Sequence, residues 1–554
     1  MPKLVNSRWI YWVILLTVIV NLNEAEGASN SGIDESNQFW FVNRRQVTEK
    51  THGFPWPMPQ SMHLGSILGI RPSNFKIVTS YKCDILQKAI TRYKRLMFPV
   101  ASQNNEHDHL SADVQFATLS VCVKHPCERY PYFGMDENYK LNVWANGTGQ
   151  LSAISIWGAL RGLETFSQLI VIQHSLQYGI RTASIEDWPR FPHRGLLLDT
   201  GRHFVALDSL KETLDLMAQN KLNVLHWHIV DDQSFPYQSA TFPRVTERGA
   251  YSPLHVYSRS DVAAVLEYAR LRGVRVVPEF DTPGHTQSWG DGQANLLAEC
   301  YDKTGKPTGA SALLDPTLDS TWDFLLALFT EILHTFPDKF IHLGGDEVYY
   351  QYSCWMNNPR IQSWMKLWNY TTAIQLEEFY FTHFFPILER ARSGNGYLVW
   401  EEVVNHNINL PEDVIAHVWK RGHNLTHATS KGYKAIISSC WYLNLIHYGS
   451  DWTTYYQCDP QQFNGTEDQK RLVLGGEACM WGEFVDSTNL TPRLWPRASV
   501  VAERLWSAQG VNDTDEAIAR LEEHRCRLLM RGYPVEPANG PGFCQIPFKH
   551  RSYR

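Results

Sequence analysis

Short apolar runs alternate with longer stretches of helical pattern over most of the chain. Between residues 195 and 477 the sequence contains eight such runs, each short enough to be a strand. They are residues 195–199, 224–229, 274–280, 340–343, 397–400, 414–419, 435–438 and 472–477. Strands that alternate with helices predict a parallel sheet, and eight such units fit a (β/α)8 TIM barrel with insertions.

A different pattern precedes these units. Strand-like runs occupy 75–78 and 139–143, and apolar side chains recur at helical spacing over 84–97 and 154–170. We therefore expect a small non-catalytic α/β domain, an α+β sandwich, before the barrel. Few reactive residue types gather there, so this domain is expected to support the chemistry rather than to perform it.

Two prolines within residues 188–192 interrupt regular structure and mark the expected boundary. The small domain is thus expected over residues 55–187 and the catalytic barrel over residues 188–554. The N-terminus carries basic residues, an apolar run at 9–20 and then small residues, which is the pattern of a secretory signal peptide over residues 1–27. A polar segment, residues 28–54, would follow it.

The apolar run of 12 residues is too short to cross a bilayer. No later segment is long and apolar enough to do so, and the alternative for residues 9–20 is an uncleaved anchor. The net charge of −6 does not suggest a nucleic acid or another polyanion as partner. The 20 tryptophans and 25 tyrosines suit stacking on the apolar faces of sugars, although aromatic residues are also ordinary core.

The ten cysteines of an apparently secreted chain predict disulfides. The expected pairs are Cys526 with Cys544, Cys440 with Cys458, Cys300 with Cys354, and Cys83 with either Cys127 or Cys122. Cys479 lies in a very apolar context and is expected to be a free buried thiol.

Six Asn-x-Thr sequons support a glycosylated protein of the secretory pathway. They are at Asn146, Asn369, Asn424, Asn464, Asn489 and Asn512. Asn489 is the weakest of them, because Pro492 follows its threonine.

The segment from His342 to Glu347 is the most informative one. A buried strand is followed by two glycines and then at once by the adjacent carboxylates of Asp346 and Glu347. Because adjacent carboxylates repel each other, one of them is expected to have a raised pKa and to hold a proton. A protonated carboxyl beside an ionised one is what glycosidic bond cleavage requires. The alternative is a turn with two solvated acids.

Each of the eight runs ends in or leads into polar or aromatic side chains, on the face where barrel enzymes place their active sites. In chain order they are Asp199 and Arg202; Asp231 and Asp232; Glu279, Asp281 and His285; Asp346 and Glu347; Trp400 and Glu402; Trp419; Tyr442 and Asn444; and Trp481 and Glu483. A polar residue at the end of one strand would not indicate a site, but such residues at the ends of all eight predicted strands predict a binding site.

These strand ends resemble glycoside hydrolase family 20, and within it the animal lysosomal β-N-acetylhexosaminidases. The resemblance runs from about residue 55 to the C-terminus, and its motifs are long and specific. They are residues 193–199, 226–232, 279–285, 342–347 and 475–483. The resemblance implies an exo-acting enzyme that removes terminal β-linked GlcNAc or GalNAc from glycans, glycolipids or chitooligosaccharides without a cofactor.

The resemblance also implies retaining catalysis in which the 2-acetamido oxygen of the substrate attacks the anomeric carbon, through an oxazolinium intermediate. Glu347 would be the general acid and then the base, and Asp346 would orient the acetamide. Tyr442 would hydrogen-bond the acetamido oxygen. His285 with Asp231 would form a hydrogen-bonded relay that tunes Glu347.

The remaining residues would bind the sugar. Trp400, Trp419 and Trp481 would wall a small apolar box for the acetyl group, Arg202 and Glu483 would bind hydroxyls, and Asn444 would reach an outer hydroxyl. The resemblance further implies a homodimer, in which a loop of the partner shields the site, and a lysosomal or secreted protein.

Several of these residues have an alternative interpretation as structural residues or as metal ligands. Trp400 and Trp419 end apolar strands and could be ordinary core, and Asp199 could be structural, paired with Arg194 or Arg202. His226 and His228 share one strand face, as metal ligands can. A metal-dependent barrel hydrolase and a catalytically silent sugar-binding barrel are therefore the competing hypotheses, and we expect neither a metal nor a cofactor.

Overall fold

The computed structural model describes residues 52–99, 114–173, 177–406, 408, 410–420 and 424–549. The signal peptide expected at residues 1–27 and nearly all of the polar segment at 28–54 lie outside the described residues. Within the described part, no helix has both the length and the apolar character needed to cross a membrane.

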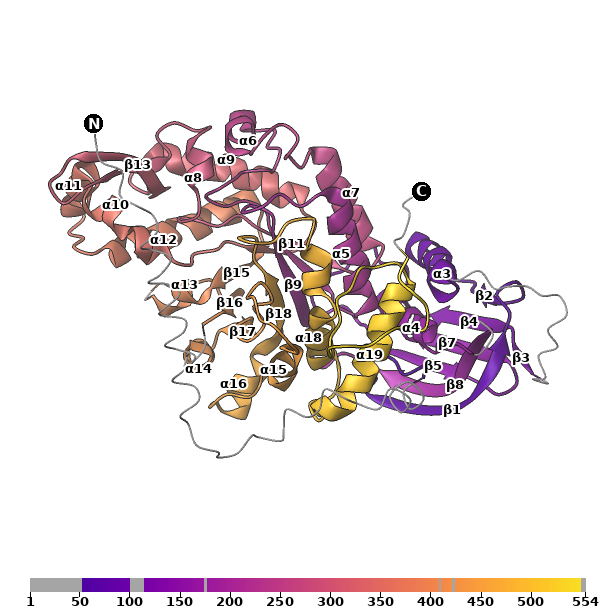
Figure 1. Cartoon of the computed structure of the whole chain (residues 1–554). Helices are drawn as coiled ribbons and strands as arrows, with labels where there is room; N and C mark the ends of the chain where they lie inside the picture. Colours follow the sequence, from indigo (N-terminus) through magenta and orange to yellow (C-terminus); the bar gives the residue numbers. More distant parts are fainter. Residues whose placement is uncertain are drawn as a thin grey trace, which may run out of the picture. The chain divides into compact units, whose positions relative to one another are not determined.

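An eight-stranded mixed sheet with two helices forms the first folded part (Figure 1). The sheet order is β2 (Lys76–Val78), β4 (Thr118–Val123), β6 (Thr148–Ala153), β5 (Tyr139–Val143), β8 (Tyr178–Asp187), β1 (Ser61–Ile70) and β3 (Gln115–Phe116), and β7 (Ile170–Ile172) pairs with β8. The helices are α3 (Asp84–Met97) and α4 (Ile156–Gln168). The Ser155 side chain caps α4 by accepting the backbone N–H groups of Trp157 and Gly158.

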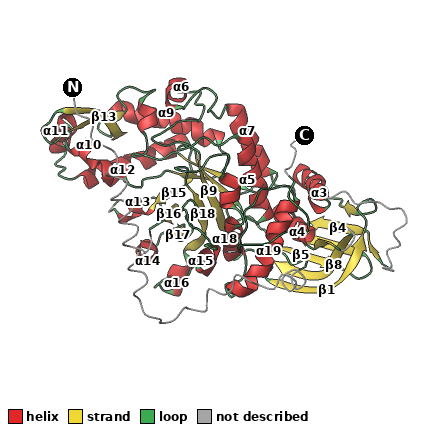
Figure 2. Cartoon of the chain, in the orientation of Figure 1, coloured by secondary structure: helices red, strands yellow, loops and turns green. Residues whose placement is uncertain are grey.

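Eight parallel strands then close into a barrel, which confirms the predicted fold (Figure 2). They are β9 (His193–Asp199), β10 (Val224–His228), β11 (Arg275–Glu279), β14 (Phe340–His342), β15 (Gly396–Trp400), β16 (Val414–Val418), β17 (Lys434–Ile437) and β18 (Val473–Met480). Every one overlaps a run identified in the sequence. Nearly all their residues are buried, because side chains fill the barrel and helices cover it.

Helices follow the strands, and a hairpin and a short 3-10 turn also lie between them. The helices are α5 (Leu207–Gln219), α6 (Pro243–Gly249), α7 (Arg259–Arg270), α8 (Gln287–Gly290), α9 (Asp319–Thr335), α10 (Tyr352–Met356), α11 (Pro359–Leu367), α12 (Ala373–Ala391), α13 (Glu401–Asn405), α14 (Asn424–Ser430), α15 (Trp452–Gln457), α16 (Glu467–Arg471), α17 (Leu490–Leu494), α18 (Arg497–Trp506) and α19 (Thr514–Met530). A hairpin of β12 (Leu297–Tyr301) and β13 (Pro307–Leu314) lies between β11 and β14, and the 3-10 turn η3 (Val348–Gln351) follows β14.

Buried ion pairs join the small sheet domain to β9 and to the loop between α5 and β10 of the barrel. Lys221 Nζ lies 2.8 Å from Asp187 Oδ2, and Arg194 lies 2.6 Å from Glu137 Oε1. All four side chains are at most 2% exposed, so removing one partner would leave an uncompensated buried charge. The pairing of Arg194 with Glu137 leaves Asp199 free to meet Arg202.

Four disulfides staple the structure: Cys83–Cys127, Cys300–Cys354, Cys440–Cys458 and Cys526–Cys544. Cys83 thus pairs with Cys127 rather than with Cys122, and Cys122 and Cys479 are free cysteines. Cys300–Cys354 ties the β12–β13 hairpin to α10, next to the segment that follows β14.

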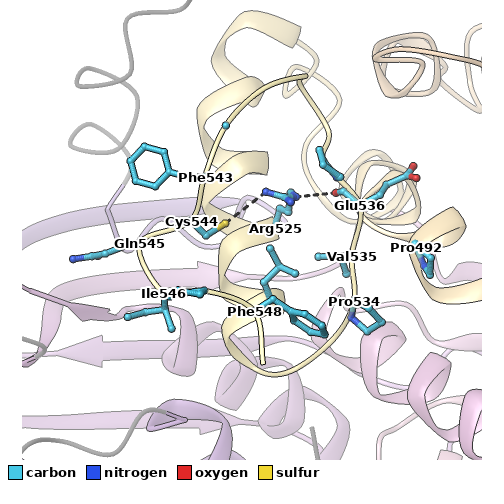
Figure 3. Close-up of a pocket in the computed structure, with 14 residues that line it drawn as sticks. Pro492, Arg525, Pro534, Val535, Glu536, Phe543, Cys544, Gln545, Ile546 and Phe548 are labelled. Carbon is cyan, nitrogen blue, oxygen red and sulfur yellow. Dashed lines mark hydrogen bonds between the residues drawn. The ribbon is translucent and has the colours of Figure 1, made fainter. Parts of the chain in front are cut away.

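The last described segment, residues 531–549, folds back on α19 (Figure 3). Cys526–Cys544 fastens it, and Arg525 Nε donates a hydrogen bond of 2.8 Å to the carbonyl oxygen of Glu536. Between this segment and α19 lies a mostly apolar pocket of about 860 Å³. None of its lining residues belongs to the polar strand ends.

Candidate active site

Strand register brings the polar strand ends into one layer of the barrel. His228 is the register partner of Asp199 on one side and of Glu279 on the other, and Glu279 is in turn the partner of His342. These four residues end β9, β10, β11 and β14. The carboxyl ends of neighbouring parallel strands therefore deliver a row of ionisable side chains to one face.

The carboxylates of Asp346 and Glu347 follow β14 through two glycines that the geometry requires. Gly344 and Gly345 have φ angles of 71° and 97°, which L side chains rarely adopt. A Cβ atom on Gly344 would lie 1.6 Å from Asp281 Oδ1. The Gly345 N–H donates to that same Asp281 oxygen at 2.9 Å. The glycines thus let the backbone pass close to Asp281 and present the acid pair beyond it.

Glu347 is the more exposed of the two acids, and its pKa is raised. Its side chain is 35% exposed, against 12% for Asp346. Partial burial raises the pKa of Glu347, and the charge of Asp346 raises it further. Glu347 also holds a left-handed backbone conformation at φ 56°, which is uncommon for a residue other than glycine. Such an outlier next to an acid pair points to a functional constraint.

A histidine connects the acid pair to a buried aspartate. His285 Nδ1 lies 3.2 Å from Asp231 Oδ1, and its Nε2 lies 3.7 Å from Asp346 Oδ2 and 3.9 Å from Glu347 Oε2. Burial opposes its charge, but Asp346 and Asp231 raise the pKa of His285 well above its usual range. His285 is therefore a cation placed between Asp231 and the acid pair.

Asp231 is held by cations on two further sides. Arg202 lies 2.9 Å and His228 Nε2 2.8 Å from its Oδ2 atom. Burial acts to raise the pKa of Asp231, yet His285 and Arg202 hold that pKa well below its usual range. Arg202 also lies 3.2 Å from Asp199. Of the two partners considered for Asp199, Arg194 and Arg202, it is thus Arg202 that pairs with it.

An apolar box lies beside the acid pair. Leu197, Trp400, Cys479 and Trp481 form one buried cluster, and Trp419 and Tyr442 pack against it; we call these six residues the aromatic box. Burial, with smaller contributions that include the charge of Asp346, raises the pKa of Tyr442, so its hydroxyl keeps its proton. The tryptophans are thus core residues, and Tyr442, which packs against them, is near enough to Asp346 for that charge to act on it.

Hydrogen bonds fix the indole rings of the aromatic box. Trp400 Nε1–H donates to Glu279 Oε1 at 2.8 Å, and Trp419 Nε1–H donates to Glu402 Oε2 at 3.1 Å. The guanidinium of Arg202 lies 5.0 Å above the ring of Trp481. The walls of the box are therefore oriented by charged partners.

Asn444 and Glu483 differ in burial, and neither contacts the acid pair by a hydrogen bond among the described residues. The Oδ1 atom of Asn444 is buried without a hydrogen-bond partner among the described residues, and Glu483 is exposed. Glu483 is near enough for its charge to raise the pKa of Arg202, against the effect of burial and after Asp199 and Asp231.

Two neighbours of the acid pair, Asp281 and Lys420, were assigned no role from the sequence. Burial, and then the charge of Asp346, raises the pKa of Asp281 well above its usual range. Lys420 Nζ pairs with Glu402 Oε1 at 2.7 Å and lies 4.8 Å from the ring centre of Trp419. Asp281 was visible as a polar strand end, whereas Lys420 directly follows Trp419 and gave no signal of its own.

Three groups of side chains near this face have ligand atoms close enough to hold a metal ion. They are His226 with His342 and His417, Asp231 with Asp232 and His285, and Asp281 with His285 and Asp346. The rings of His226 and His342 stack at 4.5 Å, and His226 lies 2.8 Å from Glu477. Both histidines of the metal alternative, His226 and His228, thus have carboxylate partners.

The sequons differ in accessibility. Asn146, Asn369, Asn464 and Asn512 are exposed. The side-chain amide of Asn424 donates to Glu401 at 2.6 Å, and that of Asn489 donates to the Phe484 carbonyl at 2.9 Å. These two amides are engaged in the folded chain.

Comparisons with known proteins agree with this geometry. The sequence profile "Glycosyl hydrolase family 20, catalytic domain" matches residues 191–509, and "beta-acetyl hexosaminidase like" matches residues 55–169. The beta subunit of β-hexosaminidase from Mus musculus is 48% identical over 507 residues, which cover 89% of this chain and 93% of that protein. The alpha subunit from the same organism is 44% identical over 515 residues, covering 90% and 95%.

A solved structure extends the likeness to three dimensions. The chitobiase of Flavobacterium johnsoniae superposes with a TM-score of 0.74 at 30% sequence identity, covering 85% of this chain and 72% of that one. With the family profile spanning the whole barrel and relatives this similar along nearly the full length, the chain belongs to glycosyl hydrolase family 20.

Proposed function

We propose that this protein is an exo-acting β-N-acetylhexosaminidase that works by retaining, substrate-assisted catalysis. The observation that carries the proposal is the position of the acid pair, Asp346 and Glu347, beside the aromatic box. The box is built from apolar and aromatic side chains, three of them indole rings, so its chemistry suits a methyl group on an amide. An acetamide held there would have its oxygen beneath the ring that bears the scissile bond.

In the first step Glu347 donates its proton to the leaving oxygen while the acetamido oxygen attacks the anomeric carbon. The glycosidic bond breaks, and an oxazolinium ring forms with positive charge shared by its nitrogen. Asp346 accepts a hydrogen bond from the acetamide N–H and stabilises that charge, and Tyr442 donates a hydrogen bond from its hydroxyl to the acetamido oxygen. In the second step Glu347 takes a proton from water, and the water opens the ring with net retention of configuration.

The relay supports both proton transfers. His285 is cationic and lies between Asp231 and the acid pair. A fixed positive charge there stabilises the carboxylate that Glu347 becomes after donating its proton. Arg202 and Glu483, on the rim of the site, are proposed to bind sugar hydroxyls, with Asn444 at an outer position.

Assembly and compartment belong to the same proposal. Leu445, Ile446, Tyr448 and Phe484 are between 53% and 108% exposed and follow Tyr442 and Trp481 in the chain. We propose that a second copy covers this apolar rim in a homodimer. The sequons and disulfides support a glycosylated protein of the secretory pathway, either lysosomal or secreted.

The test is hydrolysis of paired chromogenic β-glycosides of GlcNAc and GalNAc between about pH 3 and about pH 8. Release of the free sugar with an acidic optimum, unchanged by a chelator, is the expected result. No turnover of either sugar by folded protein would overturn the proposal in favour of a silent sugar-binding barrel. Loss of turnover with a chelator would favour the metal-dependent alternative.

A further inference from the structure

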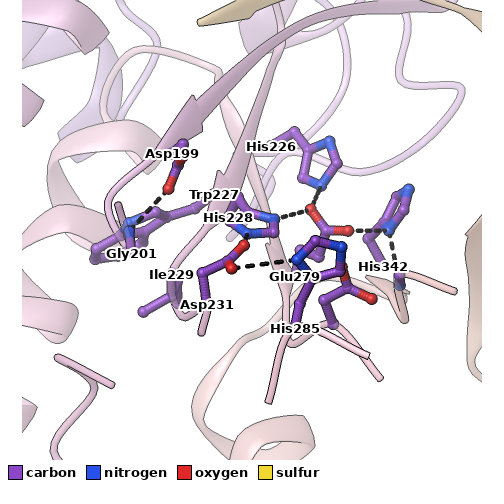
Figure 4. A network of polar contacts seen from close by, with 12 residues as sticks. Asp199, Gly201, His226, Trp227, His228, Ile229, Asp231, Glu279, His285 and His342 are labelled. Atoms are coloured by element: carbon purple, nitrogen blue, oxygen red, sulfur yellow. Dashed lines mark hydrogen bonds and ion pairs between the residues drawn. The ribbon is translucent and has the colours of Figure 1, made fainter. Parts of the chain in front are cut away.

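A fully buried carboxylate, Glu279, meets four nitrogen atoms, and Figure 4 shows its three histidine partners. Its Oε2 atom lies 2.5 Å from His228 Nδ1 and 3.0 Å from His226 Nε2. Its Oε1 atom lies 2.9 Å from His342 Nδ1 and 2.8 Å from Trp400 Nε1. Two of these contacts, with His228 Nδ1 and Trp400 Nε1, are hydrogen bonds, and the nitrogens of His226 and His342 lie at ion-pair distance.

One of these contacts leads to the general acid. The other ring nitrogen of His228, Nε2, lies 2.8 Å from Asp231 Oδ2. Asp231 Oδ1 lies 3.2 Å from His285 Nδ1, and His285 Nε2 lies 3.9 Å from Glu347 Oε2. Glu279 therefore begins a chain of alternating anions and cations that ends at the proposed proton donor.

A second contact leads to the aromatic box. The indole N–H is the only polar hydrogen of the Trp400 side chain, and it donates to Glu279. The ring of Trp400 also stacks on His417 at a centroid distance of 4.1 Å. The hydrogen bond and the stacking together fix how the indole faces the box.

The charges around Glu279 favour its ionised form. Burial acts to raise the pKa of Glu279, but His342, His228 and His226 hold it well below its usual range. In the opposite direction burial lowers the pKa of His228, yet Glu279 and Asp231 raise it to about 10. Among the described residues, the ionisable groups that face this layer from the surrounding strands and loops are His226, His228, His342, His417, Asp199, Asp231, Asp281, Glu477 and Cys479.

We propose that Glu279 is a positioning residue for both halves of the reaction. It orients His228, Asp231 and His285 toward the acid, and it fixes the Trp400 indole against the acetamide. Glu279 does not touch the substrate in this scheme. The inference rests on the proposed hexosaminidase activity, because it assigns the support of that same site.

The test compares Glu279→Gln with the matched control Glu477→Gln. Glu477 is equally buried, and its ionic partners among the described residues are His193 at 2.6 Å and His226 at 2.8 Å. Neither partner belongs to the relay or to the aromatic box. Both variants remove one buried negative charge with little change of shape, so both are expected to lower the melting temperature.

Only Glu279→Gln is expected to alter the chemistry. We expect its kcat/KM to fall about a hundredfold, as for a misplaced catalytic group. Removing a negative charge while His228 stays protonated adds net positive charge near the relay and lowers the pKa of Glu347. In the pH profile of kcat/KM, the alkaline limb, where activity falls as pH rises, should therefore move to lower pH. Affinity for a thiazoline mimic of the cyclised acetamide should fall as well, whereas Glu477→Gln should leave the limb and this affinity unchanged.

Two single variants separate the two proposed roles of Glu279, which are to orient the relay and to fix the Trp400 indole. They test the proposal even if Glu279→Gln does not fold. Trp400→Phe removes the N–H group and should weaken thiazoline binding without moving the limb. His228→Gln removes a positive charge, so it should move the alkaline limb of the pH profile to higher pH. Its ring also packs edge-on against Trp481 at 5.0 Å, so thiazoline affinity should fall, but by less than in Trp400→Phe. Each should also be non-additive with Glu279→Gln in its own readout, because Glu279 acts through it.

Equal losses in Glu279→Gln and Glu477→Gln, with the same limb and the same inhibitor affinity, would reduce Glu279 to a structural role. Additivity in both cycles, or single variants that shift neither readout, would overturn the inference as well. An inactive wild-type enzyme would instead refute the proposed function, so the two failures are distinguishable.

Discussion

The Nε2 atom of His285 lies 3.9 Å from the Oε2 atom of Glu347. His285 is held by Asp231 on its other side, and its pKa is raised well above the usual range although burial opposes the charge. The proposed acid therefore faces a fixed cation, while its own pKa is raised by burial and by Asp346. Opposing effects of this kind let one carboxyl donate a proton in one step and accept a proton in the next.

Glu347→Gln should separate substrates by leaving group. Without a proton donor, substrates with a poor, alcohol-like leaving group should lose most of their rate. A nitrophenolate needs little protonation, so its first step should be partly spared. Comparing kcat/KM for nitrophenyl and disaccharide substrates measures this. An equal loss on both would contradict the role of acid for Glu347.

Asp346→Asn should behave differently, because it weakens orientation of the acetamide whatever the leaving group. Loss of one electrostatic stabiliser typically costs about 3 kcal/mol, or about a hundredfold in rate. The loss should be similar for good and poor leaving groups, and a thiazoline inhibitor should bind weakly. Rescue by azide to give an α-glycosyl azide would instead identify Asp346 as a direct nucleophile.

The raised pKa of Glu347 also predicts how stability depends on pH. A carboxyl whose pKa is higher in the folded than in the unfolded state stabilises the fold fully below the unfolded value. That contribution is lost as pH rises through the folded value. Glu347→Gln should therefore gain about 1–3 °C in melting temperature over wild type near neutral pH, and less at low pH. Melting curves across pH measure this, and a gain that grows toward acid would contradict it.

Substrate charge provides another test. Leu445 directly follows Asn444, is 53% exposed at the rim of the proposed site and offers no charge to a substrate group. A sulfate there would lose water without gaining a charged partner. We expect a strong preference for the neutral sugar over its 6-sulfate, and Leu445→Arg should shift kcat/KM toward the sulfated one.

Comparable kcat/KM values for the two sugars in the wild type would contradict that expectation. They would point to a cation from another loop, and Lys420, beside Trp419 and paired with Glu402, would be the first to replace by methionine.

Much of the barrel could be predicted because its strands are buried on both faces. Such strands are short, continuous apolar runs that stand out between amphipathic helices. The small domain was harder. Residues 139–143 and 84–97 were recognised, but β1 and β8 were not. In β1, polar and apolar residues alternate imperfectly, and a register shift between Leu64 and Ile67 interrupts its pairing with β8.

The polar strand ends were also visible in the sequence, since a barrel gathers them whatever lies between. Their mutual contacts were not. The four nitrogen atoms around Glu279 come from β10, β14 and β15, and strand register together with side-chain orientation decides which atoms meet. Gly344 shows the same limit, because its closeness to Asp281 becomes visible only when β11 and β14 lie side by side.

The most direct test of the whole account asks whether the substrate's own acetamide is the nucleophile. Fluorine atoms on the N-acetyl methyl group withdraw electrons and weaken the carbonyl oxygen as a nucleophile while changing its size little. Initial rates with nitrophenyl substrates carrying zero to about three such fluorines give the dependence. The account expects kcat/KM to fall steeply with each fluorine, in the wild type and in Glu347→Gln. Rates that do not change along the series would contradict attack by the acetamide.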